Sequence, residues 1–281
     1  MTRIITCDEI TRAVADLCRQ ANYYLGEDVR AALEGALARE VSPQGKDVLN
    51  QLLENAAIAA AEEVPICQDT GVAVVFLELG QEVQVQGGYL YDAINAGVRQ
   101  GYTEGYLRKS MVYPPLNGRN TGDNTPAIIH TEIVPGDKLT ITVAPKGGGS
   151  ENMSAAVMLA PAAGIRGVKE FVLETVKKAG PNPCPPLIVG VGIGGNFEKC
   201  ALLAKKALLR PLGEPHPLEG IAALERDLLE SINCLGIGPG GFGGRMTALA
   251  VHVEIFARHI ASLPVAVNIQ CHAARHKSIT L

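Results

Sequence analysis

Glycine-rich loops alternate with apolar runs along this chain, and this alternation limits the folds that it can adopt. The loops lie at 146–150, 190–195 and 236–244. The apolar runs beside them predict strands at 187–191, 247–255 and 263–269, and helices after residue 150 and at 196–209. Because Gly adopts backbone conformations that other residues avoid, sharp turns can join these elements. The pattern predicts an α/β fold of the mixed α+β type.

The first quarter of the chain is predicted to be helical. Apolar residues follow the helical period from residue 8 to residue 63, with an interruption at Gly26 and a new start at Ser42 and Pro43. Pro65 ends this region. No internal repeat and no linker-like segment is present. We therefore predict one large domain over 1–281, in which a helical lobe covers about 1–64.

The middle of the chain contains further strand and helix signals. They predict a strand at 72–79, a loop at 113–126, and helices at 88–106, 169–179 and 217–233. Two more apolar runs, at 128–134 and 138–143, are joined by Pro135-Gly136-Asp137 and predict a β-hairpin. The expected architecture is a set of mixed β-sheets flanked by helices.

Charge and cysteine content exclude several classes of protein. The net charge of −4 argues against a bulk nucleic-acid binder, because such domains are usually basic. No stretch of 18 uncharged apolar residues suggests a membrane span, and the N-terminus has no apolar targeting segment. Seven scattered cysteines are an odd number, which argues against a disulfide framework. We expect a reducing compartment and a cytoplasmic protein.

Three cysteines, Cys67, Cys184 and Cys271, stand among turn formers or polar residues at the edges of apolar runs. Their separations are 117 and 87 residues, and no CxxC occurs, so a zinc knuckle or a ferredoxin-type cluster is not expected. Three dispersed thiolates suit a cluster in which one iron has no protein ligand and can act as a Lewis acid. The alternative is that they are ordinary cysteines without a function.

The other four cysteines favour structural positions. Cys18 and Cys200 lie within helical periodicity, and Cys7 and Cys234 also resemble core or helix residues. Cys234 precedes a glycine-rich loop and is the best rival ligand.

Four motifs, at 65–71, 146–152, 182–195 and 236–244, resemble those of class I fumarate hydratases and L-tartrate dehydratases. The resemblance covers essentially the whole chain. It implies a [4Fe–4S] cluster held by Cys67, Cys184 and Cys271. It further implies that this chain is an α subunit that needs a separate β subunit, and we expect an (αβ)2 assembly.

The resemblance also implies site residues next to the first cysteine. Gln68 is expected to contact the substrate and Asp69 to be catalytic, because both follow a ligand Cys directly. The alternative for Asp69 is an Asx-type turn. Arg108 is the best candidate to clamp a carboxylate, since Arg forms bidentate contacts with that group. Lys109 and Arg119 are weaker candidates for the same contact.

Further substrate contacts are expected elsewhere. Gly148 and Gly149 can aim backbone N–H groups at an anion, although the loop could also be a simple turn. His259, placed by family position, is expected to be catalytic and substrate-binding; a satisfied core histidine is its alternative. His130 is given no role. A G-x-G-x-x-G match at 190–195 is a weak dinucleotide signal, because no acidic residue ends a second strand at the required distance.

The resemblance, together with these residues, implies a hydro-lyase that reversibly hydrates fumarate to (S)-malate. The alternative substrate is L(+)-tartrate, which would give oxaloacetate. A non-lyase alternative is an iron–sulfur redox or scaffold protein, which would need a fourth protein ligand such as Cys234. A non-catalytic binding subunit with a structural cluster is a third possibility.

Overall fold

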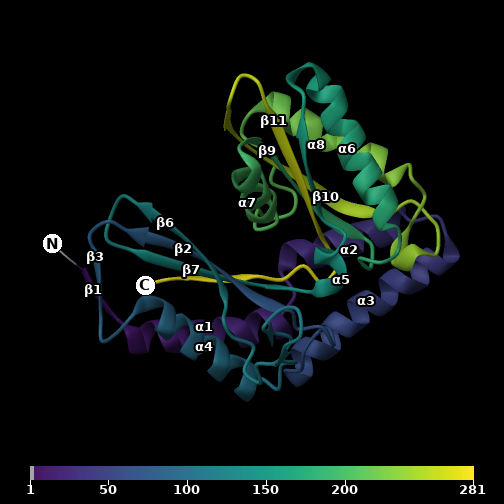
Figure 1. Cartoon of the computed structure of the whole chain (residues 1–281). Coiled ribbons are helices and arrows are strands. Elements are labelled where there is room, and N and C mark those ends of the chain that lie inside the picture. Colours follow the sequence, from purple (N-terminus) through teal and green to yellow (C-terminus); the bar gives the residue numbers. More distant parts are fainter. Residues whose placement is uncertain (1–2) are drawn as a thin grey trace. The chain divides into compact units, whose positions relative to one another are not determined.

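The computed structural model describes residues 3–281 and confirms a mixed α/β fold (Figure 1). The chain forms two compact units. Unit 1 consists of residues 3–25, 55–148 and 275–281, and unit 2 consists of 26–54 and 149–274. Each unit has its own hydrophobic core. The assignment of 1–281 to one hydro-lyase domain with a lobe at 1–64 stays a prediction.

The central sheet of unit 1 has four strands in the order β12-β7-β2-β6. These strands are β12 (Lys277–Thr280), β7 (Leu139–Lys146), β2 (Val72–Gly80) and β6 (Ile128–Val134). β2 pairs in parallel with β6 and antiparallel with β7, and β12 pairs antiparallel with β7. The last strand in the chain therefore closes one edge of the sheet.

The predicted hairpin between residues 128–134 and 138–143 is wrong, because β2 lies between these two strands. At the end of β2, the N–H groups of Gly80 and Gln81 donate to the carbonyls of Lys138 and Val134, both at 2.8 Å. Residues 80–82 thus take the backbone partners that a hairpin would have used. A turn signal is the same whether the flanking strands pair with each other or with a third strand, so local sequence could not distinguish the two.

Two helices, α1 (Cys7–Tyr23) and α4 (Leu90–Glu104), pack with this sheet into the core of unit 1. A capping box between Thr6 and Glu9 begins α1. α4 approaches α1 closely because Gly97 and Gly101 have no side chain: a Cβ at either would lie 2.6 Å from a carbonyl oxygen of α1. The remaining strands are β1 (Arg3–Thr6) and β3 (Val83–Gln86), which pair in parallel, and β4 (Val112–Tyr113) and β5 (Arg119–Asn120), which pair antiparallel within the predicted loop.

Unit 2 is built on a sheet with the order β10-β9-β11-β8. The strands are β10 (Ala248–Arg258), β9 (Leu187–Gly195), β11 (Leu263–Gln270) and β8 (Ala155–Leu159). α6 (Gly164–Ala179) and α8 (Glu219–Asn233) share the main core with one face of this sheet. α7 (Phe197–Ala207) packs through Cys200 and Ala204 against Ala266, whose neighbours on β11 face the main core (Figure 1). Helices therefore cover both faces.

The glycines at 190–195 have a packing role. Gly190 and Gly192 lie inside β9, where a Cβ would come within about 2 Å of the α7 carbonyls of Ala204 (2.1 Å) and Cys200 (2.0 Å). α7 can therefore lie directly on the strand. The run continues β9 and does not form a dinucleotide-binding turn.

The predicted N-terminal helices are confirmed as α1, α2 (Glu27–Arg39) and α3 (Pro43–Glu62). α2 belongs to unit 2, and α3 contributes residues to both units. The helix predicted after residue 150 is only one turn, α5 (Gly148–Glu151). Two short 3-10 helices lie elsewhere in the chain, at Pro161–Ala163 and Pro239–Gly241. Within residues 3–281, no helix is long and apolar enough to cross a membrane.

Candidate functional site

The loop at 66–71, between α3 and β2, carries three of the predicted site residues and is fixed at its start. The N–H of Ile66 donates to the carbonyl of Asn22 at 2.9 Å, and its carbonyl accepts the Asn55 side-chain amide at 2.8 Å. Ile66 is buried, whereas Cys67 is half-buried and Gln68 is exposed. The loop therefore presents its polar side chains from a rigid base.

Asp69 joins this loop to the glycine-rich loop of unit 1. Its Oδ1 accepts the N–H of Gly71 at 3.0 Å, which is the Asx turn, and its Oδ2 accepts the N–H of Gly148 at 2.8 Å. Gly71 has φ +71°, and a Cβ there would lie 2.6 Å from the carbonyl carbon of Lys146. The Gly148 amide is thus already engaged by the protein. A carboxylate has about four lone-pair sites, so Asp69 can still accept from a ligand.

Three consecutive carbonyls of this loop are held from within unit 1. Arg275 Nη2 donates to the carbonyl of Asp69 at 2.6 Å. The hydroxyl of Tyr102 lies 3.0 Å from the carbonyl of Thr70 and 3.1 Å from that of Gly71. Burial raises the pKa of Tyr102, so its hydroxyl stays a donor. Sequence analysis missed both Arg275 and Tyr102, since Tyr102 is part of the apolar face of α4.

Arg108 lies beside the same loop. Its carbonyl accepts the Thr70 hydroxyl at 2.9 Å, so its backbone position is fixed. Its side chain is exposed, and within residues 3–281 its guanidinium makes no ion pair or hydrogen bond. Arg108 is therefore available to bind a carboxylate. Gln68, Asp69, Arg108 and Gly148 all belong to unit 1.

Cys184 and the segment after Cys271 are neighbours in unit 2. The carbonyl of Cys184 accepts hydrogen bonds from the backbone N–H of His272 at 3.4 Å and from its Nδ1 at 3.0 Å. Cys184 has φ +56°, a conformation that non-glycine residues rarely adopt, and its own N–H donates to the carbonyl of Pro181. These bonds bring Cys184 close to the residue that follows Cys271.

Glu40 is a buried carboxylate that sequence analysis did not single out. It accepts the N–H groups of Val41 and Ser42 beside it, and those of Arg245 and Met246 at the end of the 236–244 loop, at 2.7–3.0 Å. Burial alone would raise the pKa of Glu40, but these donors together hold it below the ordinary value of 4.5. Glu40 therefore anchors the 236–244 loop within unit 2.

That loop also supports the Cys184 turn. The N–H of Gly240 donates to the carbonyl of Pro185 at 2.8 Å. Gly241 has φ +81°, and a Cβ there would lie 2.3 Å from Cβ of Pro181. The glycines at 236–244 thus permit a close approach of two loops.

His259 is exposed in the turn between β10 and β11, so the alternative of a core histidine is excluded. Its Nδ1 accepts the N–H of Ala261 at 3.1 Å, which places the proton of the neutral ring on Nε2. Gly149 is exposed as well, and both residues belong to unit 2. Their assigned roles stay predictions.

Comparison with known proteins identifies the family. The family described as Fumarate hydratase (Fumerase) matches residues 11–280. This chain belongs to that family. A protein of Methanocaldococcus jannaschii with the provisional name L(+)-tartrate dehydratase subunit alpha is 47% identical over 272 residues, 95% of each chain. The L(+)-tartrate dehydratase subunit alpha of Escherichia coli K12 is 34% identical over 275 residues, 97% of this chain and 90% of that protein.

The predicted resemblance to class I fumarate hydratases and L-tartrate dehydratases is thereby confirmed, and the chain is a hydro-lyase of this type. Members of the fumarate hydratase family use an iron–sulfur cluster. The relatives are named as alpha subunits, which implies a beta subunit as the partner in those enzymes.

The thiols of this chain fit the family's cluster in their chemistry. Cys67 and Cys271 are half-buried and Cys184 is exposed, whereas Cys7, Cys18 and Cys200 are buried. Burial raises the pKa of Cys18 to about 12, so that thiol is a poor ligand. No disulfide and no metal-binding group of three His, Cys, Asp or Glu side chains occurs within residues 3–281, and the three predicted ligands are divided between the two units.

Cys234 differs from the expectation of a core residue. It is exposed, at the end of α8. Because it is exposed, Cys234 stays an alternative ligand for the cluster.

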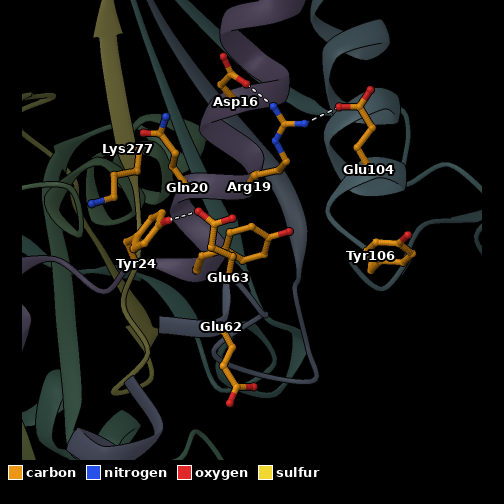
Figure 2. A pocket seen from close by; sticks show the side chains of 10 residues that line it. Asp16, Arg19, Gln20, Tyr24, Glu62, Glu63, Glu104, Tyr106 and Lys277 are labelled. Carbon is orange, nitrogen blue, oxygen red and sulfur yellow. Dashed lines mark hydrogen bonds and ion pairs between the residues drawn. The ribbon is translucent and has the colours of Figure 1, made fainter. Parts of the chain in front are cut away.

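Unit 1 also has a cavity of about 700 Å³ (Figure 2). None of the predicted site residues lines it. Arg19 pairs with Asp16 and Glu104, and the Tyr24 hydroxyl donates to Glu63 at 2.7 Å (Figure 2). The lining has four carboxylates and two cations: Asp16, Glu62, Glu63, Glu104, Arg19 and Lys277. A surplus of negative charge disfavours a dicarboxylate, so this cavity is a poor substrate site.

Proposed function

We propose that this chain is the α subunit of an L(+)-tartrate dehydratase, which removes water from L(+)-tartrate to give oxaloacetate. The observation that carries the proposal is that relatives 34–47% identical over at least 95% of this chain bear that name. This substrate was the alternative to fumarate in the sequence-based prediction. The exposed Arg108 and Gln68 beside Asp69 suit either dicarboxylate.

In this proposal Cys67, Cys184 and Cys271 hold a [4Fe–4S] cluster. When bound, the cluster would supply a Lewis acid that helps hydroxide to leave. Three protein thiolates would leave one iron open, as the family's chemistry requires.

The chain's own residues would bind and orient the substrate. Arg108 would form a bidentate contact with one carboxylate, and Gln68 would donate to the same ligand. Asp69, held by Gly71 and Gly148, would accept a hydrogen bond from a substrate hydroxyl through its remaining lone pairs. His259 would donate from Nε2, because its Nδ1 is already an acceptor. The role of Gly148 would be indirect, through Asp69, and Gly149 would offer its amide to an anion.

A β subunit would complete the site, and the two chains would form an (αβ)2 assembly. The alpha-subunit names of the relatives support a β partner. Cytoplasmic location is part of the same proposal, because oxygen-sensitive clusters and unpaired thiols survive best in a reducing compartment.

The deciding experiment is to co-express this chain with its proposed β chain and to purify the complex without oxygen. We expect oxaloacetate from L(+)-tartrate, measured by its reduction with NADH in a coupled assay. Fumarate from (S)-malate, followed by its ultraviolet absorbance, would move the assignment to fumarate hydratase, the name of the family itself. Turnover of neither substrate would contradict the proposal.

The ligand set is tested with Cys67→Ser, Cys184→Ser and Cys271→Ser, and with Cys234→Ser as the matched exposed control. Each of the first three variants should lose iron and activity, and Cys234→Ser should keep both. Loss of iron in Cys234→Ser would instead favour a four-ligand redox or scaffold cluster.

A further inference from the structure

We propose that Arg275 is a positioning residue. It fixes the backbone of the 66–71 loop at Asp69, and its buried positive charge favours an anionic group on that loop. The identity of the anion, a thiolate-bound cluster, rests on the proposed function. The mechanical part, the fixing of the loop, rests on the geometry of unit 1 alone.

The first observation is the contact that Arg275 makes. Its Nη2 donates to the carbonyl of Asp69 at 2.6 Å, and both residues belong to unit 1. Asp69 stands two residues after Cys67, and Arg275 stands four residues after Cys271 in the sequence. One guanidinium therefore fixes the backbone that follows one predicted ligand and itself lies shortly after another.

The second observation is that the charge of Arg275 is poorly compensated. The residue is 5% exposed, and its Nε is buried without a hydrogen-bond partner. Within residues 3–281 no carboxylate forms an ion pair with it, and its bonded partner is a neutral carbonyl. A buried charge without a counter-charge destabilises the folded protein. Such a charge is retained at little net cost where an anion binds nearby.

The third observation is that the next two carbonyls of the loop are held as well. Arg275 holds the carbonyl of Asp69, and Tyr102 holds those of Thr70 and Gly71. With three successive carbonyls held, the backbone of Asp69, Thr70 and Gly71 has few conformations left. Positioning of this kind is typically worth about 10–100-fold in metal affinity or activity.

The test compares Arg275→Gln, which removes the charge but keeps a donor, with Arg275→Lys, which keeps the charge. Tyr23→Phe is the matched control, because Tyr23 also makes a buried hydrogen bond to a backbone carbonyl of unit 1, that of Gly105 at 2.9 Å. All variants are made in the full chain with its β subunit. The readouts are iron retained against a chelator, kcat and KM for L(+)-tartrate, and amide hydrogen exchange of residues 67–71 before the cluster is loaded.

We expect Arg275→Gln to exchange faster at 67–71, to hold iron about 10–100-fold more weakly and to lose kcat with little change in KM. Arg275→Lys should recover most of the iron retention, and Tyr23→Phe should match the wild type in all three readouts. The proposal is overturned if Arg275→Gln behaves like Tyr23→Phe, or if the Lys and Gln variants lose iron equally. If the wild type holds no cluster, the proposed function fails, and hydrogen exchange still decides whether Arg275 fixes the loop.

Discussion

Asp69 shows how one residue of the predicted site can serve two purposes. Its carboxylate closes an Asx turn on Gly71 and also holds Gly148. The two interpretations drawn from sequence, turn and site, therefore do not compete. A short polar side chain that is fixed by two backbone donors is well suited to meet a ligand, because no rotamer freedom is lost on binding.

At the same scale, Gly71→Ala should be far more harmful than Gly122→Ala. Both glycines have positive φ, +71° and +81°, so both substitutions cost about 1–2 kcal/mol in backbone strain. At Gly71 the new Cβ would also lie 2.6–2.7 Å from backbone atoms of Lys146, whereas at Gly122 no atom lies within 4 Å. Thermal unfolding of the two variants checks this, and equal losses of stability would show that the close approach to Lys146 is unimportant.

Sequence alone could propose residues for the chemistry but could not point to the residues that hold their backbone in place. Cys67, Gln68 and Asp69 form a compact motif, and the resemblance named their roles. Arg275 and Tyr102 act through backbone carbonyls, which every residue has, so no motif marks them. Glu40 was overlooked for the same reason: its partners are four N–H groups, two of them about 200 residues away.

At the scale of elements, helices were predicted better than strand pairing. The helical periodicity of α1 to α4 and α6 to α8 follows from a local repeat of buried positions, as in the Ile10, Val14 and Leu17 stripe of α1. The missed strands have short or mostly exposed sequences and are defined by their partners; they are β1, β3, β4, β5, β8 and β12. The same dependence on partners made the hairpin prediction wrong.

Glu40→Gln tests the anchor between the α2–α3 junction and the 236–244 loop. A Gln side chain has one acceptor oxygen and no charge, so buried N–H groups lose their partner, and we expect a loss of about 2–3 kcal/mol in unfolding free energy. Glu34→Gln on the exposed face of α2 is the control and should change stability by less than about 0.5 kcal/mol. Equal effects would mean that the anchor contributes nothing.

The pH dependence of the same variant has a definite sign. Because the pKa of folded Glu40 is lowered below 4.5, its contribution is present above that value and is lost as the pH falls through the lowered pKa. The wild type should therefore lose more stability than Glu40→Gln between about pH 6 and about pH 3, measured by urea unfolding.

At the scale of the whole molecule, neither compact unit is continuous in sequence. The chain passes between units at 25–26, 54–55, 148–149 and 274–275, and the crossing at 54–55 lies inside α3. No change in composition accompanies these crossings. This explains why sequence analysis found no boundary: the units are defined by contacts, not by linkers.

This arrangement predicts that the fragment 149–281 will not fold alone. It lacks α2 and Glu40, and so leaves the N–H groups of Arg245 and Met246 without their acceptor. A single chain in which a Gly/Ser linker joins 149–274 to 26–54 restores both and should fold. Circular dichroism and cooperative melting distinguish the two, and a cooperative transition in the fragment 149–281 would contradict the prediction.

The position of β12 has a consequence for how the protein is made. β7 is translated early, but its outer edge stays open until β12, at residues 277–280, has been synthesised. At about 5–20 residues per second, the intervening stretch takes roughly 7–27 s. An open edge strand is a template for pairing with other chains throughout that interval. The yield of this sheet is thus tied to the speed of the ribosome between the codons of β7 and those of β12.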